Sequence, residues 1–151
     1  MKRIPFTEEG LEKLKKEQEE LTQRRKETVK SVSRAREMGD LSENGLYKAA
    51  KSELYDIDRQ LRRIKYFLTY ATPIKKVSKN KIDLGSKILL ETEGETKEFE
   101  IVGDFEANPR EGKISQNSPL GKELMNKESS QSIEIMAPNS KIKIYIIKKI
   151  Y

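Results

Sequence analysis

Two carboxylates, Asp40 and Glu43, are the residues of this chain best suited to chemistry, and Glu37 lies one helical turn before them. In an exposed loop a carboxyl group titrates near its free value of about 4, so both acids would be ionised at neutral pH. Ionised carboxylates bind cations and orient water molecules. The chain has no histidine and no cysteine, which removes the usual general base, thiolate metal sites and disulfides.

Two acids alone make a poor metal site. Mg²⁺ commonly takes one or two protein carboxylates, keeps several waters and draws its other ligands from elsewhere. Asp40 and Glu43 would become useful on delivery into a site that already holds a metal and a phosphate, where two-metal hydrolysis needs a second ion and an activated water. A purely structural interpretation stays open, in which Asp40 caps the following helix and Glu43 favours its first turn.

A calcium-binding EF-hand is a further interpretation of the same loop. Its first, third, fifth and sixth positions would be Asp40, Ser42, Asn44 and Gly45. The twelfth position, which requires a bidentate glutamate, would be Lys51. We therefore reject a calcium loop.

The acids lie at the centre of a predicted helical hairpin. Inward-facing positions spaced alternately three and four residues apart run up to the loop and away from it again, the spacing of a coiled coil. The two patterns mirror each other about Leu41. We call these positions the seam of the hairpin. They are Leu11, Leu14, Gln18, Leu21, Arg25, Thr28, Val32 and Ala35 before the loop, and Tyr47, Ala50, Leu54, Ile57, Leu61, Ile64, Leu68 and Ala71 after it. A helix over residues 7–38 would hold the loop roughly 45 Å from its base.

The second half of the chain changes to strand periodicity. Residues 87–91 and 97–102 predict one β-hairpin, and residues 133–136 and 142–146 predict another. Ser118 followed by Pro119 predicts the start of a short helix that ends at Leu124. We therefore expect an α+β protein with three parts: an N-terminal antiparallel α-helical coiled-coil hairpin domain (residues 1–74), a basic linker (75–82), and a small antiparallel β-sheet with a short helix (83–151).

The net charge of +6 comes from the half of the chain that forms the hairpin. A basic face indicates an acidic partner such as nucleic acid, although solvated helix faces give the same pattern. The candidate contacts are Arg24, Arg25, Lys26, Lys30, Arg34, Arg36, Lys48 and Lys51. We interpret Tyr47 and Tyr55 as seam and near-seam packing. No stretch approaches the roughly 20 apolar residues that span a bilayer, so we expect a cytoplasmic protein with no membrane partner.

Several segments resemble one family. The tip sequence Ala-Arg-Glu-Met-Gly-Asp-Leu-Ser-Glu-Asn over residues 35–44, followed by Tyr47 and Ala49-Ala50, resembles the tip signature of the bacterial Gre factors (GreA/GreB family), which stimulate transcript cleavage by RNA polymerase. The opening over residues 4–11 resembles their N-terminus. Residues 101–107 and 114–121 resemble signatures of their C-terminal domain, so the resemblance covers nearly the whole chain.

The resemblance implies a function. In that family the hairpin enters the secondary channel of RNA polymerase, while an FKBP-like C-terminal domain docks on the channel rim. The tip acids help to hold a second Mg²⁺, shared with the polymerase, and to position the attacking water. The polymerase's own active site then cuts backtracked RNA near the nascent RNA 3′ end, so the factor is not itself an enzyme.

The family roles transfer to this chain by motif position. Asp40 would bind the metal ion, and Glu43 would position the attacking water. The segment that docks on the polymerase would contain Asp104, Ser118, Pro119 and Leu120. We expect a monomer that binds no cofactor stably when it is free.

The chain departs from the family at Gly45-Leu46, where Ala-Glu is usual, and a glycine there loosens the first helical turn by up to about 1 kcal/mol. Three other functions stay open: a coiled-coil adaptor or chaperone, a channel-blocking transcription inhibitor without cleavage activity, and a peptidyl-prolyl isomerase. The isomerase is the weakest, since residues 81–151 offer few aromatic side chains to line a proline pocket, chiefly Phe99, Phe105, Tyr145 and Tyr151.

Overall fold

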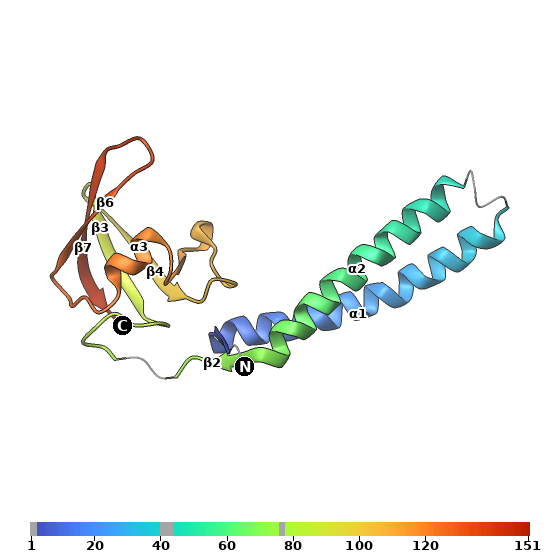
Figure 1. Ribbon diagram of the computed structural model, residues 1–151, viewed down its shortest axis with the longest axis horizontal. Helices are drawn as coiled ribbons and strands as arrows, with labels where there is room; N and C mark the ends of the chain where they lie inside the picture. The colour runs from blue at the N-terminus through green and yellow to red at the C-terminus, as the bar shows by residue number, and fades with distance from the viewer. Residues whose placement is uncertain (1–2, 40–43, 76–77) are drawn as a thin grey trace. The chain divides into compact units, whose positions relative to one another are not determined.

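The computed structural model describes residues 3–39, 44–75 and 78–151 and divides into two units. The first unit, residues 9–71, is the helical hairpin. The second combines residues 3–8 with residues 72–151. Figure 1 shows the elements of both units along the chain.

The hairpin consists of α1 (Glu8–Glu37) and α2 (Gly45–Tyr70), which lie side by side in Figure 1. Its core is the predicted seam: Leu21, Ile57 and Ile64 are buried, and Leu14, Leu61 and Leu68 pack against them. Near the loop, Thr28 and Ala35 are also buried. The coiled-coil prediction is therefore confirmed for this unit with two exceptions. The side chain of Arg25 is exposed, and Ala71 lies just beyond the end of α2, in a short strand.

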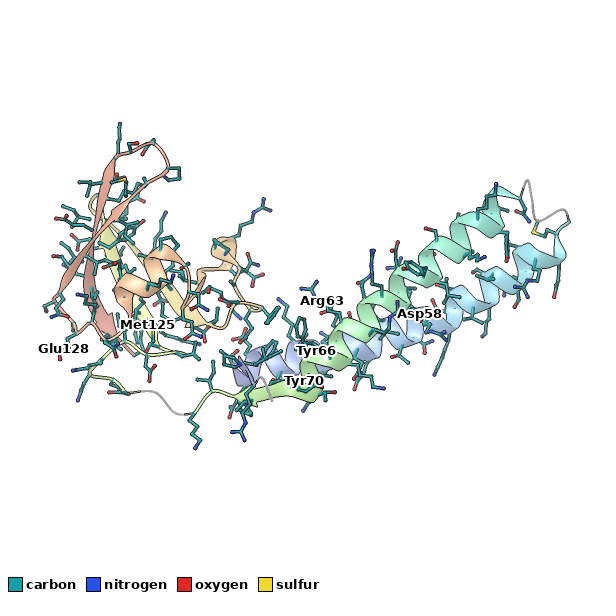
Figure 2. All side chains as sticks on the ribbon, viewed as in Figure 1. Asp58, Arg63, Tyr66, Tyr70, Met125 and Glu128 are labelled. Carbon is teal, nitrogen blue, oxygen red and sulfur yellow. The ribbon has the colours of Figure 1, made fainter. Side chains whose placement is uncertain are left out.

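Two ion pairs join the helices beside the seam. The Arg24 guanidinium lies 2.6 Å from the Glu53 carboxylate, and the Arg25 Nε lies 2.5 Å from Asp58 Oδ1. The hydrogen bond from Arg25 holds the pKa of the Asp58 carboxyl below its ordinary value. Asp58 is labelled partway along the hairpin in Figure 2. Exposed pairs of this kind add little stability, so their main effect is to favour one alignment of the two helices.

Aromatic side chains gather in the last turns of α2. The rings of Tyr66 and Tyr70 lie 4.9 Å apart between centroids, and the Arg63 guanidinium lies 5.3 Å from the ring centre of Phe67. Figure 2 labels Arg63, Tyr66 and Tyr70 on this helix. Phe67 is buried although it is absent from the predicted seam.

The second unit contains a five-stranded sheet in the order β5-β4-β3-β7-β6. Its strands are β3 (Lys87–Thr92), β4 (Glu95–Val102), β5 (Lys113–Ser115), β6 (Ser132–Met136) and β7 (Ile142–Ile150). A 3-10 turn η1 (Pro109–Glu111) precedes β5, and α3 (Pro119–Leu124) follows it. The core contains residues from several strands and from α3, among them Ile88, Leu90, Ile101, Leu124 and Ile147. The α+β prediction and both β-hairpins are confirmed.

The structure adds two features that the sequence did not predict. Strand β5 pairs in parallel with β4, so the sheet is mixed and not purely antiparallel. Strands β1 (Ile4–Phe6) and β2 (Ala71–Pro73) form a separate two-stranded sheet. Both were missed because a strand of three residues is too short to show an alternating pattern.

Residues 3–8 are held in the second unit by specific contacts. The carboxylate of Glu106 accepts hydrogen bonds from the Thr7 backbone N–H at 2.8 Å and from the Thr7 hydroxyl at 2.5 Å. Gly103 lies so close to Pro5 that an added Cβ would stand 2.6 Å from the Pro5 carbonyl oxygen. The N-terminal segment therefore belongs to the fold of the second unit.

Because the hairpin is only two helices thick, we expect its stability to depend strongly on single seam residues. Replacing Ile57, which is 2% exposed, by alanine should lower the free energy of unfolding by about 3 kcal/mol, as measured by urea denaturation followed by circular dichroism.

The neighbouring variant Tyr55→Ala serves as the control. Tyr55 is 63% exposed, which makes the near-seam interpretation of this tyrosine wrong. Its replacement should leave the unfolding midpoint nearly unchanged, and an equal decrease in both variants would contradict the seam as the source of stability.

Candidate functional site

The loop that joins α1 to α2 contains both predicted acids. Residues 40–43, which include Asp40 and Glu43, lie outside the described residues, so their place is known from chain order alone. On the near side Gly39 has φ +128°, a conformation that L side chains rarely adopt and that ends α1. On the far side Asn44 begins α2. Both acids thus belong to the connection at the end of a hairpin whose longer helix has 30 residues.

Asn44 is the N-cap of α2. Its side-chain oxygen accepts a hydrogen bond from the Tyr47 backbone N–H at 3.1 Å, and its side-chain nitrogen donates to the Ala35 carbonyl oxygen at 2.7 Å. No acidic residue lies in the first turn of α2. The interpretation of Asp40 as the cap of this helix is therefore wrong, since Asn44 caps it. Glu43, which was expected to favour the first turn, lies outside the described residues.

Tyr47 lies on the other side of the cap and contacts two cations. The Arg36 guanidinium and the Lys51 ammonium lie 5.9 and 5.8 Å from the centre of its ring. A hydrogen bond involving Arg36, and then the charge of Lys51, lower the pKa of the Tyr47 hydroxyl below its ordinary value. Tyr47 is half-buried, as expected for a seam position, and it also gathers positive charge beside the loop.

The structure separates the predicted basic residues into three groups. Arg24 and Arg25 are paired with acids across the hairpin, and Arg36 and Lys51 converge on Tyr47. The remaining four make no ion pair within the described part of the chain: Lys26, Lys30, Arg34 and Lys48. This last group has the charges most available to a partner.

A groove of about 380 Å³ lies between the helices next to the loop. It is lined by Ser31, Arg34, Ala35, Met38, Leu46, Ala49, Ala50 and Glu53. Met38 is 70% exposed and Leu46 is 65% exposed, so apolar side chains border the loop on both helices.

The predicted docking segment forms one hydrogen-bonded loop in the second unit. The Asp104 carboxylate accepts from the Ser115 hydroxyl and from the Asn117 amide, the latter at 2.9 and 3.1 Å. The Ser118 hydroxyl accepts from the Gly121 N–H at 3.0 Å and thereby caps α3. Leu120 packs against the core, whereas Pro119 is exposed. Asp104 and Ser118 therefore hold the loop in shape, and Pro119 is available to a partner.

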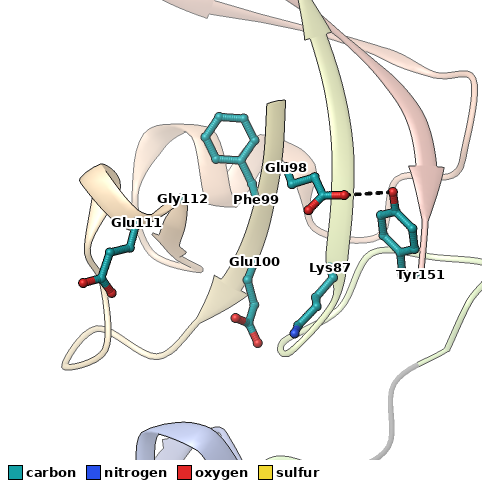
Figure 3. A pocket seen from close by; sticks show the side chains of 7 residues that line it. All are labelled: Lys87, Glu98, Phe99, Glu100, Glu111, Gly112 and Tyr151. Atoms are coloured by element: carbon teal, nitrogen blue, oxygen red, sulfur yellow. Dashed lines mark hydrogen bonds between the residues drawn. The ribbon is translucent and has the colours of Figure 1, made fainter. Parts of the chain in front are cut away.

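A pocket in the second unit tests the isomerase interpretation. Figure 3 shows its lining: Lys87, Glu98, Phe99, Glu100, Glu111, Gly112 and Tyr151. The Tyr151 hydroxyl donates to the Glu98 carboxylate at 3.1 Å, and this bond raises the pKa of Tyr151. Charged side chains outnumber the two aromatic rings, and Phe105 is exposed. The lining thus differs from the apolar aromatic pocket that a proline ring would require.

Neither a metal cluster nor a membrane-spanning segment is found in the described residues. No group of three or more acidic, histidine or cysteine side chains there could hold a metal ion. None of the described helices is both long and apolar enough to cross a bilayer.

Comparison with known proteins identifies the class to which this hairpin and sheet belong. A family described as "Transcription elongation factor, N-terminal" matches residues 4–72, and one described as "Transcription elongation factor, GreA/GreB, C-term" matches residues 77–151. The protein is therefore a transcription elongation factor, a class whose partner is RNA polymerase. More particularly, the chain belongs to the GreA/GreB family, and the family resemblance predicted from the tip sequence is confirmed.

Individual relatives are similar in sequence to this chain over nearly its full length. The transcription elongation factor GreA of Nautilia profundicola is 40% identical over 99% of this chain and 95% of its own length. That of Nitratiruptor is 38% identical over 97% of this chain and 93% of its own length. Among solved structures, the GreA factor homolog 1 of Thermus thermophilus covers 99% of both chains at 26% identity, with a TM-score of 0.48.

The contact between Arg36 and Tyr47 makes a prediction about titration. In the wild-type protein the pKa of Tyr47 should lie below its ordinary value of 10.0, because the neighbouring cations favour the phenolate. Arg36→Gln should raise this pKa, since it removes the largest cause of the shift. The pKa is measured from the NMR chemical shifts of the Tyr47 ring as a function of pH. Lys48→Gln, which removes a cation that is not over the ring, is the control and should leave the pKa unchanged.

Proposed function

We propose that the protein is a transcript cleavage factor that lends Asp40 and Glu43 to RNA polymerase. In this proposal the hairpin enters the secondary channel, and its loop reaches the nascent RNA 3′ end of a backtracked complex. The observation that carries the proposal is the pair of helices, α1 and α2, joined by the loop that contains both acids. A 30-residue helix extends roughly 45 Å, so such an arm can bring its acids to a site deep inside a partner.

The chemistry of the two acids fits a shared metal ion. Carboxylate oxygens are the ligands that Mg²⁺ prefers, but two of them leave most of its coordination sites to waters and to a partner's groups. Mg²⁺ held between the factor and the polymerase would supply Lewis-acid stabilisation and an activated water. Asp40 would bind this ion, and Glu43 would orient the attacking water by accepting its hydrogen bond. The protein would thus stimulate hydrolysis in the polymerase's active site without being an enzyme by itself.

Other parts of the chain would hold the factor in place. Lys26, Lys30, Arg34 and Lys48, which have no ion pair with any described residue, would follow the RNA backbone or acidic channel walls, with Arg36 and Lys51 closer to the loop. The loop from Asp104 to Leu120 would dock on the rim of the channel, with Pro119 exposed to the partner. We expect one copy of the chain to act in the cytoplasm.

Replacing the acids by their amides tests this proposal. Asp40→Asn and Glu43→Gln should each lower the rate of RNA cleavage in a backtracked elongation complex by about a hundredfold or more. The concentration of factor that gives half-maximal binding should stay the same, because the helices α1 and α2 and the docking loop are unchanged. Cleavage is measured from the length and yield of the released RNA.

The matched control is the double variant Glu19→Gln with Glu20→Gln. It removes two exposed acids from the same hairpin and should cleave like the wild type. Full cleavage by the tip variants would favour a coiled-coil adaptor. A wild-type protein that binds the complex and slows elongation without releasing RNA would instead be a channel-blocking inhibitor.

The cations of the hairpin that pair with no acid in the described part of the chain predict a salt dependence. For the double variant Lys30→Gln with Lys48→Gln, we expect weaker binding to the elongation complex. The slope of log affinity against log salt concentration should become less steep by about 0.7 for each single-stranded phosphate that the variant no longer neutralises. Binding is measured by fluorescence anisotropy over a series of salt concentrations.

Lys15→Gln with Lys16→Gln removes the same charge from exposed positions nearer the base of the hairpin. This variant should keep the wild-type slope. Equal slopes for the two double variants would contradict a contact between Lys30, Lys48 and the partner.

A further inference from the structure

One side chain, Asn44, joins the end of α1 to the start of α2. Its amide nitrogen donates to the Ala35 carbonyl at 2.7 Å, and its oxygen accepts from the Tyr47 N–H at 3.1 Å. Ala35 is buried in the seam, and Tyr47 is half-buried. Asn44 is therefore bonded to two residues whose positions the packing of the hairpin already fixes.

Both bonded groups lie at helix ends, where the regular hydrogen bonds of an α-helix are missing. The first four N–H groups and the last four carbonyls of an α-helix have no intrahelical partner of the regular kind. The Tyr47 N–H lies in the first turn of α2, and the Ala35 carbonyl lies in the last turn of α1, where it also accepts a bond from the Met38 N–H at 3.3 Å. A single amide group thus satisfies one helix end with its donor and the other with its acceptor.

This pair of bonds requires an asparagine. A serine at position 44 could cap α2 through its hydroxyl, because serine is as good an N-cap as asparagine. Its side chain, however, is shorter and has a single polar atom, so it would leave the Ala35 carbonyl without this donor. An alanine would remove both bonds.

We infer that Asn44 is a positioning residue for transcript cleavage. It ties the end of α1 to the start of α2, the two helix ends between which the loop runs. Asp40 and Glu43 would then reach the polymerase's active site at a defined distance from the ends of α1 and α2. This inference rests on the proposed function, because it matters to cleavage only if the acids act in the polymerase.

The experiment compares Asn44→Ser and Asn44→Ala with the wild type on a backtracked elongation complex. At saturating factor, the rate of cleavage by both variants should be lower by about tenfold or more. A displacement of a catalytic group by about 1 Å can lower a reaction rate by at least this factor. Half-saturating concentrations should stay at the wild-type value. Helix content of Asn44→Ser, measured by circular dichroism, should also match the wild type because the cap is kept.

Leu14→Ala is the control for reduced stability. Leu14 packs on the seam near the base of the hairpin, so this variant loosens the helices without touching the loop. It should show a lower melting temperature and a wild-type rate of cleavage at saturation. A slow rate in Leu14→Ala equal to that in Asn44→Ser would assign the effect to general destabilisation and overturn the inference.

A second measurement does not depend on cleavage. The chain has no cysteine, so a double variant with Ser33→Cys and Ser52→Cys would carry spin labels at these two positions and nowhere else. Both positions are exposed and lie near the loop. The distribution of label-to-label distances should be narrow when Asn44 is present and broader when the Asn44→Ser change is added. An unchanged distribution in Asn44→Ser would overturn the link between the helices.

The outcomes also separate this inference from the proposed function. A wild-type protein that releases no RNA would refute the proposed function, whatever the distance distributions show. A wild-type protein that cleaves, together with an Asn44→Ser variant that cleaves equally well, would refute the positioning role alone. Loss of cleavage in Asn44→Ala but not in Asn44→Ser would show that the cap suffices, and it would overturn the inference too.

Discussion

The packing of Leu21 against Ile57 and Ile64 is the interaction on which the hairpin depends. Two helices without a third layer bury only one stripe each, so this seam supplies most of the apolar burial that holds them together. Ion pairs beside the seam, such as Arg25 with Asp58, are exposed and influence alignment more than stability. Under the proposed function, the register of this seam would decide where the loop with Asp40 and Glu43 lies, because a shift of one helix along the other would displace the loop.

The seam was predictable from the sequence because its spacing extends over many turns and is mirrored on both sides of Leu41. The β-hairpins at β3–β4 and β6–β7 were predictable for a similar reason, since alternation over five or more residues gives a clear period. The short strands β1, β2 and β5 have three residues each and carry no period, so their pairing appears only in three dimensions.

The candidate site was partly accessible to sequence reasoning. Residue types identified Asp40 and Glu43, and chain order assigns them to the loop between α1 and α2. The role of Asn44 was missed, although an asparagine just before a helical pattern is itself a capping signal. Its second bond, to Ala35 nine residues earlier, has no signature in sequence. The division of the basic residues into paired and unpaired groups was equally hidden, because the acids that pair with two of the arginines lie far from them along the chain.

Residues 3–8 fold with residues 72–151, so in topology the helical hairpin is an insertion into the second unit and not a domain placed before it. Its two ends leave and re-enter the same small fold at β1 and β2, which pair with each other. An inserted element with paired ends can be lengthened, shortened or exchanged between relatives in matched steps on both helices while the host fold stays intact. Adding one heptad to each helix would extend the arm by roughly 10 Å. The reach of such a protein is therefore set independently of the domain that carries it.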